Sequence, residues 1–189
     1  MARKVGLEHG DVLAAAVAVA DEHGIENLNL RDVALRLGVR SPSLYHHVDG
    51  LKGLRREIAL TAAAELREIL VKAAQDQEGA GALFAVARAY RDFARQHPGM
   101  LGATLPAPHP GEDDELYDAL ASVAKVLVDI LAALGVTDDA AIHAIRTLRS
   151  FLHGFVDLEF RGGFGMPVNL EETFETGLQI LIEGLLSKR

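Results

Sequence analysis

The chain has 189 residues, 49% of them apolar, which suffices for one medium-sized domain or two small ones with a buried core. It has no cysteine, which excludes disulfides and cysteine-based metal sites, and its net charge of -8 argues against a uniformly basic surface. No apolar run approaches the roughly 20 residues of a membrane helix, and the start MARKVGLEHGD lacks the apolar core of a signal peptide, so we expect a cytoplasmic protein without membrane contact.

Apolar residues recur every three or four positions almost throughout, so we predict an all-α fold of about nine helices. The first helix should run from about Glu8 to His23 and end at Gly24. The next helix shows apolar residues at i, i+3, i+4 and i+7, which gives it a single buried face. These residues are Leu30, Val33, Ala34 and Leu37.

Local signals define both ends of this second helix. Asn29, followed three residues later by Asp32, resembles a capping box at its start. Gly38 follows the last apolar position and supplies a left-handed turn, and Val39 is placed to fill the angle between two helices.

A third helix should follow at once. Ser41 is a good N-cap, Pro42 suits the first turn, and the apolar pair Leu44 and Val48 would pack on the preceding helix. The outward side chains can all donate a hydrogen bond to a phosphate or a base edge, which a recognition helix in a major groove requires. They are Arg40, Ser43, Tyr45, His46 and His47. The alternative is an ordinary helical hairpin with a polar face.

Residues 7–60 resemble the DNA-binding domain of the tetracycline-repressor (TetR) family of bacterial transcriptional regulators. The resemblance rests on the helix that ends at Gly24 and on the stretches 30–34, 37–39, 44–45 and 47–48 and residue Leu54. It implies that Tyr45 and His47 contact the DNA backbone. The family's lysine four places after that histidine falls on Leu51, and Lys52 lies one position later, about 100° further round a helix.

We therefore expect DNA contacts from eight residues: Arg31, Arg40, Ser41, Ser43, Tyr45, His46, His47 and Lys52. Residues 1–56 hold 8 basic and 7 acidic residues, against 11 and 20 in the remainder, so affinity should rest on a few placed cations. Arg3 and Lys4 are either an arm on the DNA or a solvated terminus.

A long helix from about residue 51 to residue 77 should link a DNA-binding domain (1–50) to a helical domain (51–189). A shift of its far end would then move the DNA-binding domain. Four of the six prolines lie between His97 and Gly111, so rigid turns are expected there. The remaining helices are expected at 83–97, after an interruption at 79–81, in a short turn at 100–104, and at 116–134, 137–161 and 170–187.

The second part resembles the ligand-binding and dimerisation domain of the TetR branch named for a Trp-His-Gly motif. The similar positions are the corner at 97–99 and the step Leu152-His153-Gly154, followed by Phe155, Leu158 and Glu159. Leu152 stands where that branch has tryptophan.

The middle helices are the expected site of a small apolar or amphipathic effector, because aromatic and flexible apolar residues gather there with a few polar groups. The candidates are Phe84, Tyr90, Phe93, His97, Met100, Leu101, Leu105, Tyr117, Leu120, Arg149 and His153. The alternative is that these residues fill a closed core.

A single helix-turn-helix reads few base pairs, so we expect a homodimer on palindromic double-stranded DNA. The resemblance implies pairing through the last two helices into a four-helix bundle. The final helix carries a second stripe, Thr173, Gly177, Ile180 and Gly184, whose glycines would permit close helix approach. Packing on the protein's own core is the alternative.

The predicted function is a transcriptional regulator, most simply a repressor that a ligand releases from its operator, with no cofactor, metal or catalytic residue. A ligand-independent DNA-binding protein of the same fold is one alternative. A helical metal-dependent enzyme is another, since His153 and Asp157 lie four apart, and His143 and Glu159 are on the same predicted helix.

Overall fold

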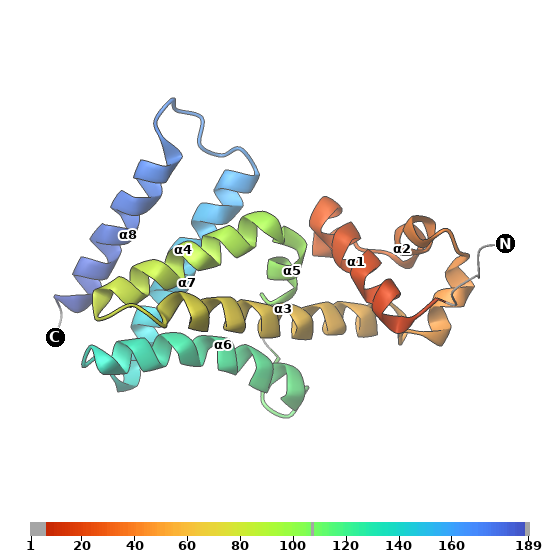
Figure 1. The fold of residues 1–189 in the computed structure, drawn as a ribbon, viewed down its shortest axis with the longest axis horizontal. Helices are drawn as coiled ribbons and strands as arrows, with labels where there is room; N and C mark the ends of the chain where they lie inside the picture. The colour runs from red at the N-terminus through yellow and green to blue at the C-terminus, as the bar shows by residue number, and fades with distance from the viewer. Residues whose placement is uncertain (1–6, 107, 188–189) are drawn as a thin grey trace. The chain divides into compact units, whose positions relative to one another are not determined.

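The structure is a computed structural model that describes residues 7–106 and 108–187. These residues form eight α-helices and two short 3-10 helices, and none of them lies in a β-strand, which confirms the predicted all-α fold (Figure 1). No helix in this part of the chain is long and apolar enough to cross a membrane. The elements are α1 (His9–His23), η1 (Ile25–Asn27), α2 (Leu30–Leu37), η2 (Ser41–His46), α3 (Gly50–Ala74), α4 (Ala80–Gln96), α5 (Pro98–Ala103), α6 (Asp114–Ala133), α7 (Asp138–Phe160) and α8 (Leu170–Leu186).

The chain forms two compact units that alternate along the sequence. The first unit takes its residues from 1–64 and 96–120, and the second from 65–95 and 121–189. The helices α3 and α6 therefore contribute one end to each unit. The division into a DNA-binding domain at 1–50 and a ligand-binding and dimerisation domain at 51–189 stays a prediction, as does the arm at Arg3 and Lys4, which lies outside the described residues.

In the first unit, α1 packs on α2 and α5. Its buried side holds Val12, Ala16, Val19 and Ala20, the residues that recur at helical spacing in the sequence. The Glu8 backbone N–H donates to Asp11 Oδ2 at 3.0 Å, which satisfies one of the donors left over at a helix start. The core of this unit is thus built around a helix of small and β-branched side chains.

Asp21, on α1, caps the short helix α5. Its Oδ1 accepts from the N–H groups of Gly99 at 2.8 Å and Met100 at 3.2 Å, and its Oδ2 lies 3.2 Å from His97 Nδ1. The free N–H groups at a helix start favour a carboxylate there. A Cβ on Gly99 would stand 2.2 Å from the backbone carbon and oxygen of Ala20, so only glycine permits this approach of α5 to α1.

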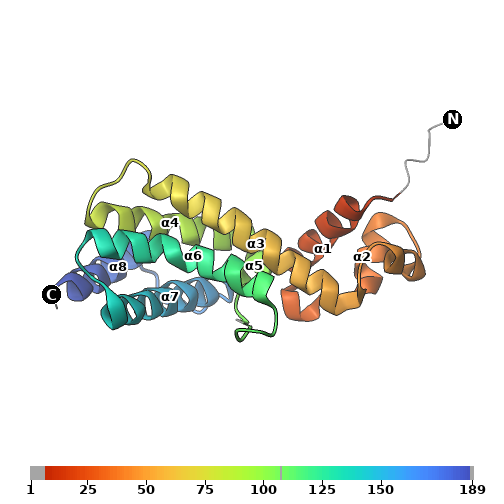
Figure 2. The same ribbon diagram turned by 90° about the horizontal axis from the view of Figure 1, so that it is seen from below.

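In the second unit, α7 and α8 are antiparallel neighbours (Figures 1 and 2). Between them the rings of Phe155 and Phe174 meet edge to face, 5.1 Å apart. The guanidinium of Arg91, from α4, lies 5.1 Å and 4.3 Å from these two ring centres, and the Arg91 side chain is only 3% exposed. It donates to Glu159 at 2.8 Å and 3.0 Å and to Glu171 at 2.7 Å, so the buried charge is paired.

Arg95 lies one turn further along α4 and joins the same two carboxylates. Its guanidinium donates to Glu159 and to Glu171, each at 2.6 Å. Arg88, one turn before Arg91, pairs with Glu175 at 2.6 Å and is more exposed. Three arginines of α4 therefore attach it to α7 and α8.

The α-helix boundaries lie within three residues of the predicted ones, and three of the shifts concern α3, α4 and α5. α3 ends at Ala74 instead of residue 77. α4 begins at Ala80, so Gly81, expected in the interruption, is its second residue. α5 begins at Pro98, because proline lacks the N–H that the first turn leaves unpaired.

Candidate nucleic-acid interface

Helix α2 begins and ends at the predicted residues. Asn29 Oδ1 accepts from the Asp32 N–H at 3.0 Å. In the reverse direction the Asn29 side-chain amide donates to Asp32 Oδ2 at 2.8 Å, whereas in a full capping box the Asn29 backbone N–H would be the donor. Gly38 adopts the left-handed φ of 67°, and the Val39 N–H donates to the Ala34 carbonyl at 3.0 Å. The chain thus turns directly from α2 into the next element.

That next element, η2, is a 3-10 helix and not the predicted α-helix. The Ser43 N–H donates to the Arg40 carbonyl at 2.9 Å, and the His47 N–H donates to the Leu44 carbonyl at 2.8 Å, each three residues back. The prediction that Ser41 is the N-cap is wrong, because Arg40 holds that position and no side chain caps the element. With six residues, η2 is long for a 3-10 helix, since runs of more than three or four residues are uncommon.

The predicted inward residues of η2, Leu44 and Val48, are both buried. On the outward side the phenol of Tyr45 is 63% exposed, and the polar residues around it also reach solvent. Arg31, Arg40, Ser43 and His46 are exposed, and Ser41 and His47 are half-buried. The predicted DNA contacts on η2 are therefore exposed or half-buried, and their roles stay predictions.

His9, at the start of α1, contacts the residues that flank η2 on its C-terminal side. Its Nδ1 donates to the backbone carbonyl of His47 at 2.7 Å, since a carbonyl oxygen can only accept. Its Nε2 lies 3.0 Å from Glu57 Oε2 on α3. A hydrogen bond from α1 thus holds the backbone at the end of η2. No local motif predicts this contact, because the two histidines are 38 residues apart.

Lys52 is exposed, but its charge lies near the acidic start of α6. Hydrogen bonds from Arg56 and from the Leu116 N–H lower the pKa of Asp113 to about 2, and the nearby charges of Arg56 and Lys52 act in the same direction. Arg56 also pairs with Glu115 at 2.7 Å. Sequence reasoning missed Arg56, although its place four residues after Lys52 puts both cations on one face of α3.

The eleven predicted ligand residues divide between the two units. The first unit holds His97, Met100, Leu101, Leu105, Tyr117 and Leu120, and the second holds Phe84, Tyr90, Phe93, Arg149 and His153. Phe93, Met100 and Leu101 are buried in core positions, whereas Leu105 and Tyr117 are exposed. The buried members are compatible with either a pocket lining or a closed core, and the site stays a prediction.

Three of these residues bring polar groups together in the second unit. Burial raises the pKa of Tyr90 to about 12, against the opposing effect of the nearby charge of Arg149. His153 follows Arg149 by one turn of α7, and its buried Nδ1 has no hydrogen-bond partner among residues 7–106 and 108–187. A phenol, a guanidinium and an imidazole are thus available here to orient a ligand.

The predicted dimer stripe on α8 is mostly accessible. Thr173, Ile180 and Gly184 are exposed, and Ile180 is 67% exposed. Gly177 differs, because a Cβ there would lie 2.9 Å from the Phe151 ring of the same chain. Its lack of a side chain is therefore explained by packing on α7, whereas nothing lies within 4 Å of a Cβ at Gly184.

The metal-site alternative gains no support from the side-chain contacts. Asp157 accepts from Arg161 at 2.8 Å, and Glu159 accepts from Arg91 and Arg95. Within the described part of the chain, no group of three or more His, Cys, Asp or Glu side chains has an arrangement that would hold a metal ion.

Both parts of the chain match family models. Residues 12–58 match "Bacterial regulatory proteins, tetR family", and residues 83–181, more than half of the chain, match "Tetracyclin repressor-like, C-terminal domain". The chain is also 31% identical over 187 residues to the uncharacterized HTH-type transcriptional regulator YobS of Bacillus subtilis (strain 168), covering 98% of this chain and 96% of YobS. The chain belongs to the TetR family.

One further repressor and two crystal structures are similar to this chain over almost its full length. The tetracycline repressor protein class A from transposon 1721 of Escherichia coli is 28% identical, with 97% of this chain and 92% of the repressor covered. The crystal structure of Mycobacterium smegmatis BioQ is 25% identical and aligns with a TM-score of 0.70 over 96% of this chain and 99% of BioQ. A crystal structure of a TetR variant from Acinetobacter baumannii AYE, in complex with minocycline, shares the fold at 24% identity and a TM-score of 0.72, with 97% of this chain and 99% of that chain covered.

Membership of the TetR family makes this chain a helix-turn-helix transcriptional regulator and identifies α2 and η2 as its helix-turn-helix. The hairpin alternative is thereby removed. The narrower assignment to the Trp-His-Gly branch stays a prediction.

Proposed function

We propose that this TetR-family regulator is a repressor that binds a palindromic operator as a homodimer and leaves it when a small apolar or amphipathic molecule binds. The observation that carries the proposal is the exposure of the polar residues of η2, where hydroxyl, phenol and imidazole groups flank the buried Leu44. The polar cluster at Tyr90, Arg149 and His153 supports an effector site in the second unit.

A second candidate is a ligand-independent DNA-binding protein of the same fold. The burial of Phe93, Met100 and Leu101 is compatible with this candidate, because these residues can also fill a closed core. Selection of bound duplexes from a random pool tests the part common to both candidates. One enriched palindrome, with half-sites about one helical turn apart, is the expected product. The absence of any enriched sequence would reject sequence-specific regulation.

Substitutions on the accessible side of η2 should separate positioning contacts from base contacts. Tyr45→Ala should weaken binding to the selected operator and to unrelated duplexes about equally, because a phosphate contact carries no sequence information. His46→Ala should instead change the preference between operators, by about 1–3 kcal/mol at the affected base pair. Both are measured as dissociation constants at fixed salt. If both variants stay within about twofold of the parent on every duplex, η2 is not the DNA-contacting element.

The proposed dimer predicts that Ile180→Glu gives a monomer. A carboxylate at the centre of an apolar interface would lose its water without gaining a partner, so the subunits should separate in sedimentation and lose the palindrome. Gln179→Glu, one residue away on a different side of α8, is the matched control and should stay dimeric. Gly177→Leu is not a clean probe, because its side chain would meet Phe151 of the same chain. A dimeric Ile180→Glu that binds DNA normally would mean that the interface lies elsewhere.

A further inference from the structure

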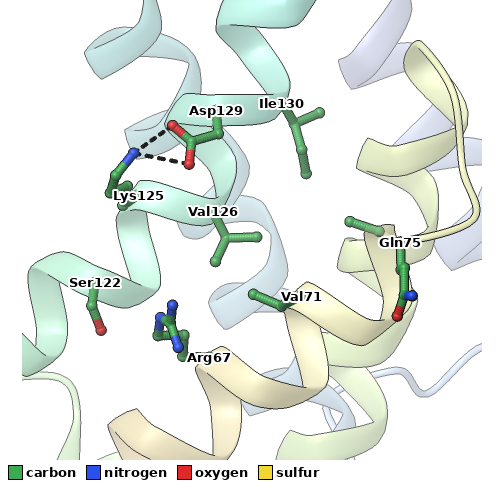
Figure 3. A pocket seen from close by; sticks show the side chains of 9 residues that line it. Arg67, Val71, Gln75, Ser122, Lys125, Val126, Asp129 and Ile130 are labelled. Atoms are coloured by element: carbon green, nitrogen blue, oxygen red, sulfur yellow. Dashed lines mark hydrogen bonds and ion pairs between the residues drawn. The ribbon is translucent and has the colours of Figure 1, made fainter.

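A groove lies between α3 and α6 in the second unit (Figure 3). It encloses about 360 Å³, which is within the range of roughly 300–1,000 Å³ typical of small-molecule sites. None of the eleven predicted ligand residues lines it. It is therefore distinct from the predicted effector site around Tyr90.

The middle of the groove is apolar. Val71 on α3 is 45% exposed, and Val126 and Ile130, four residues apart on α6, line the other wall. In Figure 3 the side chains of Val71 and Val126 extend into the space between the two helices. The α3 side extends from Arg67 to Ala74, over about 10 Å at 1.5 Å per residue, and Gln75 follows just after the helix. The apolar part of an occupant would thus be elongated and would remove exposed aliphatic surface from water.

The charges of the groove leave an excess of one cation. Its lining holds two cations, Arg67 and Lys125, and one anion, Asp129. Lys125 Nζ donates to both oxygens of Asp129, at 2.7 Å and 2.9 Å, so these two largely neutralise each other (Figure 3). Among the residues that the structure describes, no carboxylate forms an ion pair with Arg67. Arg67 lies one turn before Val71, at the end of the groove that also holds Ser122 (Figure 3).

We propose that this groove binds a small amphipathic carboxylic acid. The Arg67 guanidinium holds the carboxylate, because its planar pair of N–H donors matches the two carboxylate oxygens. The apolar body of the ligand lies on Val71, Val126 and Ile130. A neutral ligand would leave the Arg67 charge unused, and a cation would be repelled by it.

Titration calorimetry of the full chain with decanoate, below its micelle concentration, tests this. We expect saturable binding of one decanoate per chain. Arg67→Gln should weaken it about tenfold or more, the loss expected when a charge-assisted hydrogen-bonded pair is removed. Lys72→Gln is the matched control, since it removes one exposed cation from the same helix outside the groove, and it should change the affinity by less than about twofold. Decanol should bind the parent and Arg67→Gln equally and weakly.

The proposal is overturned if decanoate binding is unsaturable, if Arg67→Gln binds as the parent does, or if decanol binds as tightly as decanoate. A sedimentation change in Arg67→Gln would also overturn it, because the groove would then be covered by a second copy of the chain. Binding itself does not depend on the proposed function. Only the regulatory consequence, release of the operator by decanoate through α3, rests on it. Decanoate that binds without releasing DNA would count against that regulation and leave the site intact.

Discussion

Replacing Gly99 by alanine should destabilise the first unit by about 3 kcal/mol, the upper end of what overpacking costs. The added Cβ would stand 2.2 Å from the backbone of Ala20, and no rotation of a side chain relieves a clash with backbone atoms. α5 must then move away from α1 and lose the hydrogen bonds from Gly99 and Met100 to Asp21. Hydrogen exchange should show faster exchange at the α5 amides, and thermal unfolding should begin at a lower temperature.

Gly102→Ala is the control for the Gly99 result, because it places the same methyl group on the same short helix. Its nearest neighbour is the Cγ2 methyl of Ile25 at 3.0 Å, a side-chain atom that needs to move by only a few tenths of an ångström. Alanine also favours a helix over glycine by about 1 kcal/mol, so Gly102→Ala should be close to neutral. Equal losses in the two variants would show that the α1 backbone does not set the requirement at residue 99.

Arg91→Met should destabilise the second unit by about 3 kcal/mol, as expected when a buried ion pair loses one partner. Methionine keeps much of the apolar stem but leaves Glu159, whose side chain is only 14% exposed, without its buried partner. Loss of the guanidinium also removes the cation above the rings of Phe155 and Phe174. Arg95 still pairs with Glu159, which keeps the expected loss at the low end for a broken buried pair. Denaturant unfolding of the full chain measures the difference.

Arg88→Met is the matched control on the same helix. The pair between Arg88 and Glu175 is partly exposed on both sides, so its removal should cost less than about 1 kcal/mol. If Arg88→Met proved as damaging as Arg91→Met, burial would not be the reason for the effect at Arg91.

The same cluster makes stability depend on pH. Burial raises the pKa of Glu159, but the hydrogen bonds from Arg91 and Arg95 outweigh it, so the net pKa is lowered from 4.5. A hydrogen bond from Arg95 is the main cause of the lowered pKa of Glu171. Carboxylates with lowered pKa values stabilise the fold above their ordinary value of 4.5 and lose that contribution as the pH falls through the lowered values. In Arg91→Met this acid-dependent part of the unfolding free energy should shrink.

The predictable part of the fold follows from the helical periodicity of apolar residues and from the residues that mark helix ends. The spacing of apolar residues predicts every α-helix except α5, which the sequence suggests only as a short turn among prolines. Asn29 and Gly38 mark the ends of α2 because their effect is local. The 3-10 form of η2 was not predictable, since the apolar pair four residues apart, Leu44 and Val48, suits an α-helix equally well. The N-cap moved to Arg40 with that change.

Contacts between distant segments account for what the sequence did not reveal. In the sequence Arg91 is one more polar residue of α4. Its partners Glu159 and Glu171 come from two other helices, so only the structure shows that its charge is buried and paired. The spacing of Gly177 suits either a subunit contact or packing on the protein's own core, and it cannot tell a partner chain from Phe151 of the same chain. The candidate DNA contacts on η2 follow from the outward positions of its polar residues, and the family resemblance implies backbone contacts only for Tyr45 and His47. Their individual roles stay predictions that the substitutions described above test.

The cap that Asp21 provides for α5 can form only after α5 has been synthesised. Asp21 and Gly99 are 78 residues apart, and α5 has only six residues, too few to be stable alone in water. When residues 7–64 have emerged from the ribosome, Gly99 and Met100, whose N–H groups Asp21 binds, have not yet emerged. The segment that carries the helix-turn-helix must therefore wait for residues 96–120 before its core can close, at a few to some twenty residues per second. A nascent chain or a truncated fragment that stops before α5 would leave one side of α1 exposed.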